Sequence, residues 1–282
     1  MNDADSIFCF KDSCDHLAMS ISLQLPMGTD SISMQICDSL VAEFIRSISN
    51  SEYSGEADSI IPPCEYKRDD IQSLVDYYGH ATYQRLLKMA MSDYNDRMSY
   101  LNEDTTMSAE EREQIKADIP QWTFDLAIKK AIDAPSFVIY NSQTYCYYGG
   151  AHGGVIGTGP ITFSKANGSK IEHFLRDDAA LALQPLIRNG LLQYYSESGD
   201  TITDSQLSER LQIEGSVIPL PHHAPYLNAT ADSLVFTYAQ YEIAAYADGM
   251  PSFILPVKAL SDFLTPELRT LLGNSRAVTK EQ

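Results

Sequence analysis

The sequence predicts an α+β protein in which helices pack on an antiparallel sheet. Before Gln121, apolar residues recur mostly with a 3.6-residue period, which is typical of amphipathic helices. From Trp122 onward, apolar and polar residues alternate with a period of two, which indicates half-buried antiparallel strands. Strands and helices do not alternate regularly, as they do in parallel βαβ proteins, and this order favours the α+β class.

The first half of the chain is expected to contain one strand followed by helices. Leu17–Leu25 alternates as a strand does, and Asp30, or the serine after it, can cap a helix over Ser31–Ser49. A longer helical region follows, and Gly79 is expected to bend or split it. The capping-box sequence Ser108–Glu111 then begins a short, charged helix.

The second half of the chain is expected to form a meander of short strands with one embedded helix. Asn167-Gly168 predicts a two-residue hairpin turn, and Pro185 suits the first turn of a helix that ends near Tyr195. The expected strands are Trp122–Lys129, Ser136–Tyr140, Thr144–Tyr148, Val155–Ser164, Lys170–Phe174, Val217–Leu220, Ser233–Ala239 and Ser252–Val257, and the further helices are Asp204–Gln212, Lys258–Leu264 and Pro266–Leu272.

The change from helix to strand near Gln121 predicts two subdomains, residues 1–120 and residues 121–282. No long flexible linker separates them, so we expect them to be tightly associated rather than independent.

The charge balance excludes several classes of partner. The chain has 20 Lys+Arg and 38 Asp+Glu residues, a net charge of −18. So acidic a surface repels phosphate backbones and anionic lipid headgroups, and no nucleic-acid binding is expected. It would attract a cationic partner, although plain solubility explains the same composition. No apolar run is long enough for a membrane-spanning helix.

Neither the first residues nor the cysteines identify the compartment. The polar leader Asn2–Ser6 is no signal peptide, so the sequence fits a cytoplasmic protein or a mature secreted protein without its export segment. The five cysteines lack C-x-x-C spacing, and we expect free thiols, although Cys9 and Cys14 could be bridged. The histidines are scattered, so neither a metal ion nor another cofactor is expected.

Two local sequences are candidates for a ligand-binding site. The first is Tyr148-Gly149-Gly150-Ala151-His152, in which glycines around a histidine let another group approach the backbone closely. A tight crossover with a structural histidine would explain the same residues. The second is Tyr238–Gly249, which holds three tyrosines and two acids. Tyrosine supplies rigid contact area with a polar tip and is enriched in binding surfaces, but a buried turn is an equally good explanation.

Together the two motifs resemble the C-terminal domain of RsiV, a membrane-anchored anti-sigma factor that senses lysozyme. The same module occurs with a preceding partner domain in PdaC-type peptidoglycan deacetylases and in envelope lipoproteins, and the Ser31–Ser49 helix with the strand before it resembles that partner. Ala245 stands where the family pattern has proline. The resemblance implies a binding module of the bacterial cell envelope, outside the cytoplasm, that is either free or lipid-tethered in its full-length form. The sequence has neither a deacetylase metal motif nor a sigma-binding segment.

We therefore expect a non-catalytic module that binds an extracellular protein, such as a lysozyme, or a cell-wall glycan. The alternative hypothesis is a wall-active hydrolase or esterase, in which Glu242 acts as a base beside His152. No G-x-S-x-G or H-E-x-x-H motif supports that alternative. The expected ligand-binding residues are Tyr148, Gly149, Gly150, His152, Tyr238, Tyr241, Glu242 and Tyr246.

Overall fold

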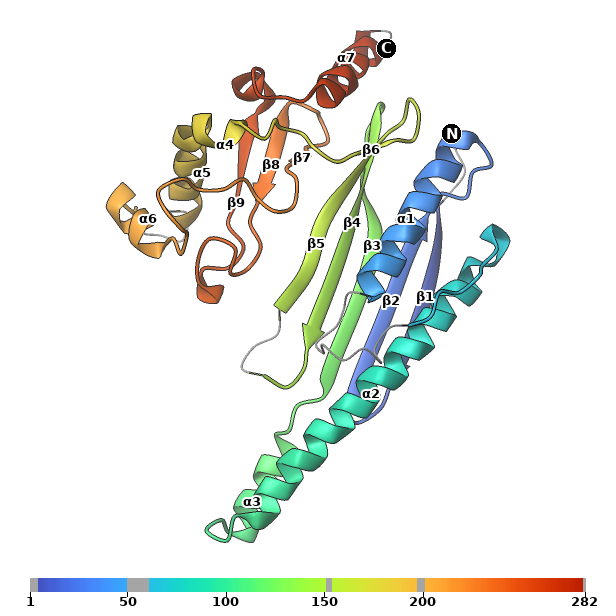
Figure 1. Ribbon diagram of the computed structural model, residues 1–282, viewed down its shortest axis with the longest axis vertical. Coiled ribbons are helices and arrows are strands. Elements are labelled where there is room, and N and C mark those ends of the chain that lie inside the picture. The colour runs from blue at the N-terminus through green and yellow to red at the C-terminus, as the bar shows by residue number, and fades with distance from the viewer. Residues whose placement is uncertain (1–4, 50–60, 151–153, 197–200, 281–282) are drawn as a thin grey trace. The chain divides into compact units, whose positions relative to one another are not determined.

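A computed structural model of the chain describes residues 5–49, 61–150, 154–196 and 201–280 (Figure 1). It contains a six-stranded sheet, a second sheet of three strands, and helices, which confirms the α+β class. The chain divides into two compact units. The first consists of residues 1–27, 37–129 and 143–157, and the second of residues 28–36, 130–142 and 158–282. The predicted boundary at Gln121 stays a prediction.

The six strands of the larger sheet follow one another in chain order. They are β1 (Ser6–Ser13), β2 (Leu17–Leu25), β3 (Trp122–Asp133), β4 (Phe137–Tyr147), β5 (Gly154–Ser164) and β6 (Lys170–Ile171). The prediction for β2 is confirmed. The antiparallel interpretation of β3 is wrong for its pairing with β2, because these two strands are parallel, with Leu17 opposite Trp122. The helices between them return the chain to the same end of the sheet, as a parallel pair requires.

Strand β1 was not expected, because its four apolar residues, Ile7 to Phe10, are consecutive and show no period of two. It pairs antiparallel with β2 at the edge of the sheet, and Phe10 is its buried residue. The ring of Phe10 lies against Gly79 of helix α2 (Ile71–Glu103), where an added Cβ would stand 2.4 Å from the ring. The prediction that Gly79 bends or splits the helix is therefore wrong, because α2 continues through it. Gly79 instead leaves space for the edge strand.

The predicted caps of the first helices are present. Helix α1 (Ser31–Ser49) begins after Asp30, whose carboxylate accepts hydrogen bonds from the N–H groups of Ile32 and Ser33. Helix α2 packs on β1 and β2 (Figure 1), and the rings of Phe44 in α1 and Tyr78 in α2 meet edge to face. The capping box of Ser108 begins helix α3 (Ala109–Ala117) as expected.

Several predicted strands have different bounds. The two strands expected between Ser136 and Tyr148 are one strand, β4, because Ser142 and Thr144 are buried polar residues that continue the alternation. The hairpin after β5 is confirmed, but its loop covers Lys165–Gly168 and is longer than the predicted two-residue turn. The returning strand β6 is shorter than predicted. No strand forms at Val217–Leu220.

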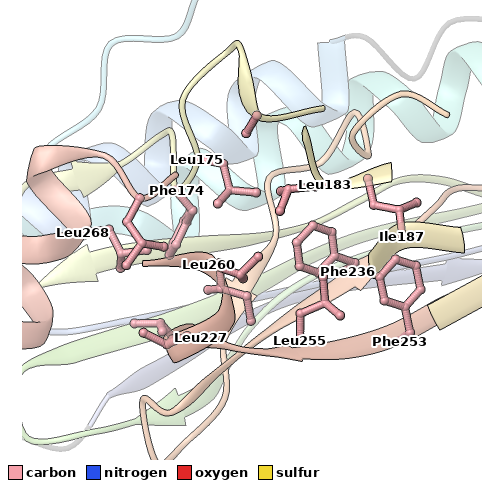
Figure 2. Packing of buried hydrophobic residues seen from close by; sticks show 14 of the residues in the cluster. Phe174, Leu175, Leu183, Ile187, Leu227, Phe236, Phe253, Leu255, Leu260 and Leu268 are labelled. Atoms are coloured by element: carbon pink, nitrogen blue, oxygen red, sulfur yellow. The ribbon is translucent and has the colours of Figure 1, made fainter. Parts of the chain in front are cut away.

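The second unit has its own core between a small sheet and helices. The sheet has the order β7-β8-β9, and the predicted helices at Pro185, Asp204 and Pro266 are present. In this core the rings of Phe236 and Phe253 stack, with their centroids 5.3 Å apart (Figure 2). The elements of this unit are β7 (Tyr226–Leu227), β8 (Ser233–Thr237), β9 (Ser252–Pro256), α4 (Ala179–Ala182), α5 (Gln184–Ser196), α6 (Asp204–Arg210) and α7 (Pro266–Lys280). A 3₁₀ turn at Val257–Leu260 stands in place of the helix expected over Lys258–Leu264.

Within the described ranges, no helix is both long and apolar enough to cross a bilayer. The same ranges hold no cluster of three or more His, Cys, Asp or Glu side chains that could bind a metal ion. All five cysteines are free thiols.

Candidate functional site

The tyrosine-rich segment of the second unit forms a compact loop between β8 and β9. Tyr238, at its start, is completely buried and donates its hydroxyl to the Pro219 carbonyl at 2.8 Å. Burial, and then the charge of Glu242, raise the pKa of this phenol above its usual range. Tyr238 therefore anchors the start of the loop in the core of the second unit, and its role in ligand binding stays a prediction.

Glu242 has an internal role in the same loop. Its side chain is only 2% exposed. One carboxylate oxygen, Oε1, accepts the N–H of His222 at 2.6 Å, and the other, Oε2, accepts the N–H of Ala239 at 2.7 Å. Charge-assisted bonds of this kind are about twice as strong as neutral ones. Glu242 thus closes its own turn and joins it to the segment before β7.

Tyr241 is presented to solvent by this turn. Its backbone has φ +64°, a left-handed conformation that is uncommon for a residue with a bulky side chain. Its side chain is 61% exposed, and its ring lies 5.5 Å from that of Tyr246, at an interplanar angle of 42°. Residues in such backbone conformations persist only where surrounding contacts impose them, and they cluster at functional sites.

The other end of the loop is held by contacts with Arg210 of α6 and with Gln212, which follows that helix. The N–H of Gln212 donates to the carbonyl of buried Ile243 at 2.8 Å. Arg210 forms an ion pair with Asp248 at 3.2 Å, and its guanidinium also lies 5.2 Å from the ring of Tyr195. The loop is therefore fixed at both ends, and this limits the entropy that Tyr241 would lose on binding.

We expect the stability of the second unit to fall at high pH. Burial, then the charges of Asp248 and Tyr194, raise the pKa of Tyr195 from 10.0 to about 12. The folded state therefore keeps this proton longer than the unfolded state, so the contribution to stability is complete below pH 10.0 and is lost as the pH rises to about 12. Urea unfolding between about pH 8 and pH 11 checks this. Tyr195→Phe should flatten the decline, and equal slopes for the two proteins would contradict the assignment.

A cavity of about 140 Å³ borders the base of the loop and was not predicted. It is lined by Asn141, Pro160, His223, Ala224, Tyr226, Thr237, Ala239 and Met250. The imidazole of His223 packs on Gly159, where an added Cβ would stand 2.7 Å from Nδ1. His222, its neighbour, has an exposed side chain and contacts Glu242 instead. The adjacent histidines His222 and His223 are the sequence feature that could have drawn attention to this cavity.

The glycine-rich motif belongs to the first unit. Tyr148 packs on the single tryptophan, Trp122, with ring centroids 4.8 Å apart. Gly149 has φ +74°, and its carbonyl accepts a hydrogen bond from Arg97 Nη2 at 2.9 Å. One carboxylate oxygen of Asp93, Oδ2, accepts two hydrogen bonds. The donors are Arg97 Nε, at 2.9 Å, and the indole N–H of Trp122, at 3.4 Å. Burial raises the pKa of the Tyr148 phenol.

A polar cavity of about 220 Å³ lies beside this cluster, between the β1–β2 turn, α2, and the start of β3. Its lining includes Asp15, His16, Asp93, Tyr94, Lys116 and Trp122. The rings of His16 and Tyr94 are 4.6 Å apart. Sequence reasoning missed Asp93 and Arg97, because their helical spacing alone marks them as an ordinary surface ion pair.

The candidate residues therefore fall into two groups. Tyr238, Tyr241, Glu242 and Tyr246 share one loop of the second unit, while Tyr148, Gly149 and Gly150 lie in the first unit. His152 lies outside the described residues, so its proximity to Glu242 stays a prediction.

Comparison with known proteins gives a family match for part of the chain. A family model described as "Protein of unknown function (DUF3298)" matches residues 174–258, which include the tyrosine-rich loop and exclude the glycine-rich motif. None of the curated proteins matches the sequence.

Two solved structures have a similar fold. One is a DUF3298 family member from Bacteroides fragilis, with 17% identity and a TM-score of 0.60, covering 96% of this chain and 99% of that one. The other is a DUF3298 family protein from Pseudomonas aeruginosa, with 14% identity, a TM-score of 0.53 and 94% coverage of both chains. The chain thus has the fold of these two DUF3298 proteins over nearly its whole length and matches the DUF3298 family model in its second half.

Proposed function

We propose that the chain is a non-catalytic binding module of the bacterial cell envelope, located outside the cytoplasm, and that the Tyr241–Tyr246 pair contacts its ligand. The observation that supports the proposal is the exposed ring of Tyr241, presented in left-handed backbone by a loop that is fixed at both ends. A rigid aromatic side chain of this kind gives contact area at a low entropic cost.

The chemistry of the loop favours binding over catalysis. A general base must be free to accept a proton from the substrate. Both carboxylate oxygens of Glu242 already accept backbone N–H groups, at 2.6 Å and 2.7 Å. The alternative function, a wall hydrolase or esterase with Glu242 as base beside His152, would require the enzyme to break the hydrogen bonds that shape its own loop.

Two ligand classes fit a tyrosine pair on an acidic chain. The net charge of −18 steers a cationic protein toward the surface, and the resemblance to the RsiV domain suggests a lysozyme as that protein. A wall glycan would instead stack its sugar faces on the two rings. Charge alone binds any basic protein weakly, so a specific ligand must depend on the tyrosines.

The test is titration of the chain with lysozyme and, separately, with soluble peptidoglycan fragments, at about 0.15 M salt, where the Debye length is about 8 Å. We expect one of these to bind and Tyr241→Ala to weaken it about 30-fold, the effect of losing a hot-spot residue. Ile254→Ala, which removes a side chain 60% exposed on nearby β9, is the matched control and should leave affinity unchanged.

Two results would overturn the proposal. One is that neither lysozyme nor the wall fragments bind at this salt concentration. The other is that Tyr241→Ala and Ile254→Ala have the same affinity, which would place the contact surface elsewhere on the chain.

A further inference from the structure

The far end of the helical hairpin in the first unit carries an apolar groove. Helix α3 lies along the last turns of α2 (Figure 1). A groove of about 330 Å³ lies between the two helices and the segment that follows α3. Its lining includes Tyr100, Leu101, Ile115, Asp118, Ile119 and Pro120.

Two large apolar side chains of this groove are exposed, while Leu101 between the helices is buried. Tyr100 is 75% exposed and Ile115 is 41% exposed. No residue of α3 is buried, and α3 has nine residues, too few to be stable on its own without its capping box. An apolar surface of this kind on a helix held by so few contacts indicates a place where another chain docks.

Carboxylates flank both exposed side chains along their own helices. Asp96 and Glu103 lie four residues before and three residues after Tyr100, so they share its helix face. Glu111 and Asp118 have the same spacing around Ile115. All four carboxylates are exposed, and none of them forms an ion pair with a cation in the described part of the chain.

Arg97, which also lines the groove, does not neutralise this acidic border. The guanidinium of Arg97 is directed to Asp93 at 2.9 Å and to the carbonyl of Gly149 at 2.9 Å. The groove therefore combines an apolar centre with an uncompensated negative edge, the complement of a basic amphipathic segment.

We propose that this groove docks a basic amphipathic segment of a partner protein. The segment places one large apolar side chain between Tyr100 and Ile115, and its lysines or arginines face Asp96, Glu103, Glu111 and Asp118. A second copy of this chain is disfavoured as the occupant, because it would bring the same four carboxylates against these. An anionic membrane is disfavoured for the same reason. The site is separate from the Tyr241 loop and does not depend on the function proposed for it.

The probe is a fluorescently labelled amphipathic helix made of leucine and lysine, with a matched peptide in which glutamate replaces every lysine. Fluorescence anisotropy is measured with the whole chain at about 0.05 M and about 0.15 M salt. We expect only the lysine peptide to bind, and Tyr100→Ala to weaken it at least about tenfold. A variant with Glu103→Gln and Glu111→Gln should keep the apolar contact and lose most of the salt dependence.

Three controls make the outcome decisive. Met91→Ala removes another exposed apolar side chain of α2 that does not line the groove, and Tyr241→Ala alters the other proposed surface; both should leave peptide affinity unchanged. Circular dichroism confirms that each variant is folded. Equal affinity of Tyr100→Ala and Met91→Ala, equal binding of the glutamate peptide, or absence of binding would overturn the proposal. So would a concentration-dependent dimer that Tyr100→Ala abolishes, because the occupant would then be a second copy.

Discussion

Phe236→Ala is expected to destabilise the second unit by about 4 kcal/mol, the usual cost of removing a buried phenylalanine. Phe236 is completely buried on the central strand of the small sheet, and its ring stacks on Phe253 at an interplanar angle of 7° (Figure 2). The ring centroids of Tyr238 and Phe253 are 6.4 Å apart. The cavity left by the substitution would therefore also loosen the start of the tyrosine-rich loop.

Urea unfolding of the whole chain measures this effect, with Ile254→Ala as the control. Ile254 lies on the neighbouring strand, opposite Val235, but its side chain points to solvent. Its loss should change stability by less than about 0.5 kcal/mol. Similar losses for the two variants would contradict the packing of this core.

The elements that sequence alone predicted well depend on local signals. Strand β2 alternates along its whole length, and the caps at Asp30 and Ser108 are formed by side chains within three residues of the helix start. These features do not require knowledge of the rest of the fold, so periodicity and capping rules identify them.

The features that sequence did not predict depend on distant partners. Strand β1, of which only Phe10 is buried, exists because it pairs with β2 and because Gly79 leaves space for Phe10. The parallel pairing of β2 with β3 depends on the path of the intervening helices. Tyr226–Leu227 is too short to show a period of two, so β7 was missed while Val217–Leu220 was wrongly predicted.

The same distinction applies to the candidate site. Composition marked the Tyr238–Gly249 segment, because three tyrosines in one turn are visible in the sequence. It could not show which tyrosine is buried: Tyr238 is, and Tyr241 is not. Nor could it show that Arg210 binds Asp248, since these residues come from separate elements.

Glu242→Ala is expected to lower the free energy of unfolding by about 3 kcal/mol and to abolish whatever binding depends on Tyr241. The substitution leaves the N–H groups of His222 and Ala239 without their acceptor, and a hydrogen bond to a charged group contributes roughly 1.5–3 kcal/mol. Because Tyr241 is in left-handed backbone, the turn should relax to an ordinary conformation once Glu242 no longer closes it.

Amide hydrogen exchange measures this directly, since the two backbone N–H groups should lose their protection in Glu242→Ala while the amides of β8 and β9 keep theirs. Glu242→Gln retains one oxygen acceptor and should lose about half as much stability. Glu209→Ala, which removes an exposed carboxylate from α6, is the control for charge and should have little effect. If Glu242→Ala instead left both amides protected and the affinity unchanged, Glu242 would not be the residue that shapes the loop, and a free carboxylate available for catalysis would become the better explanation of its presence.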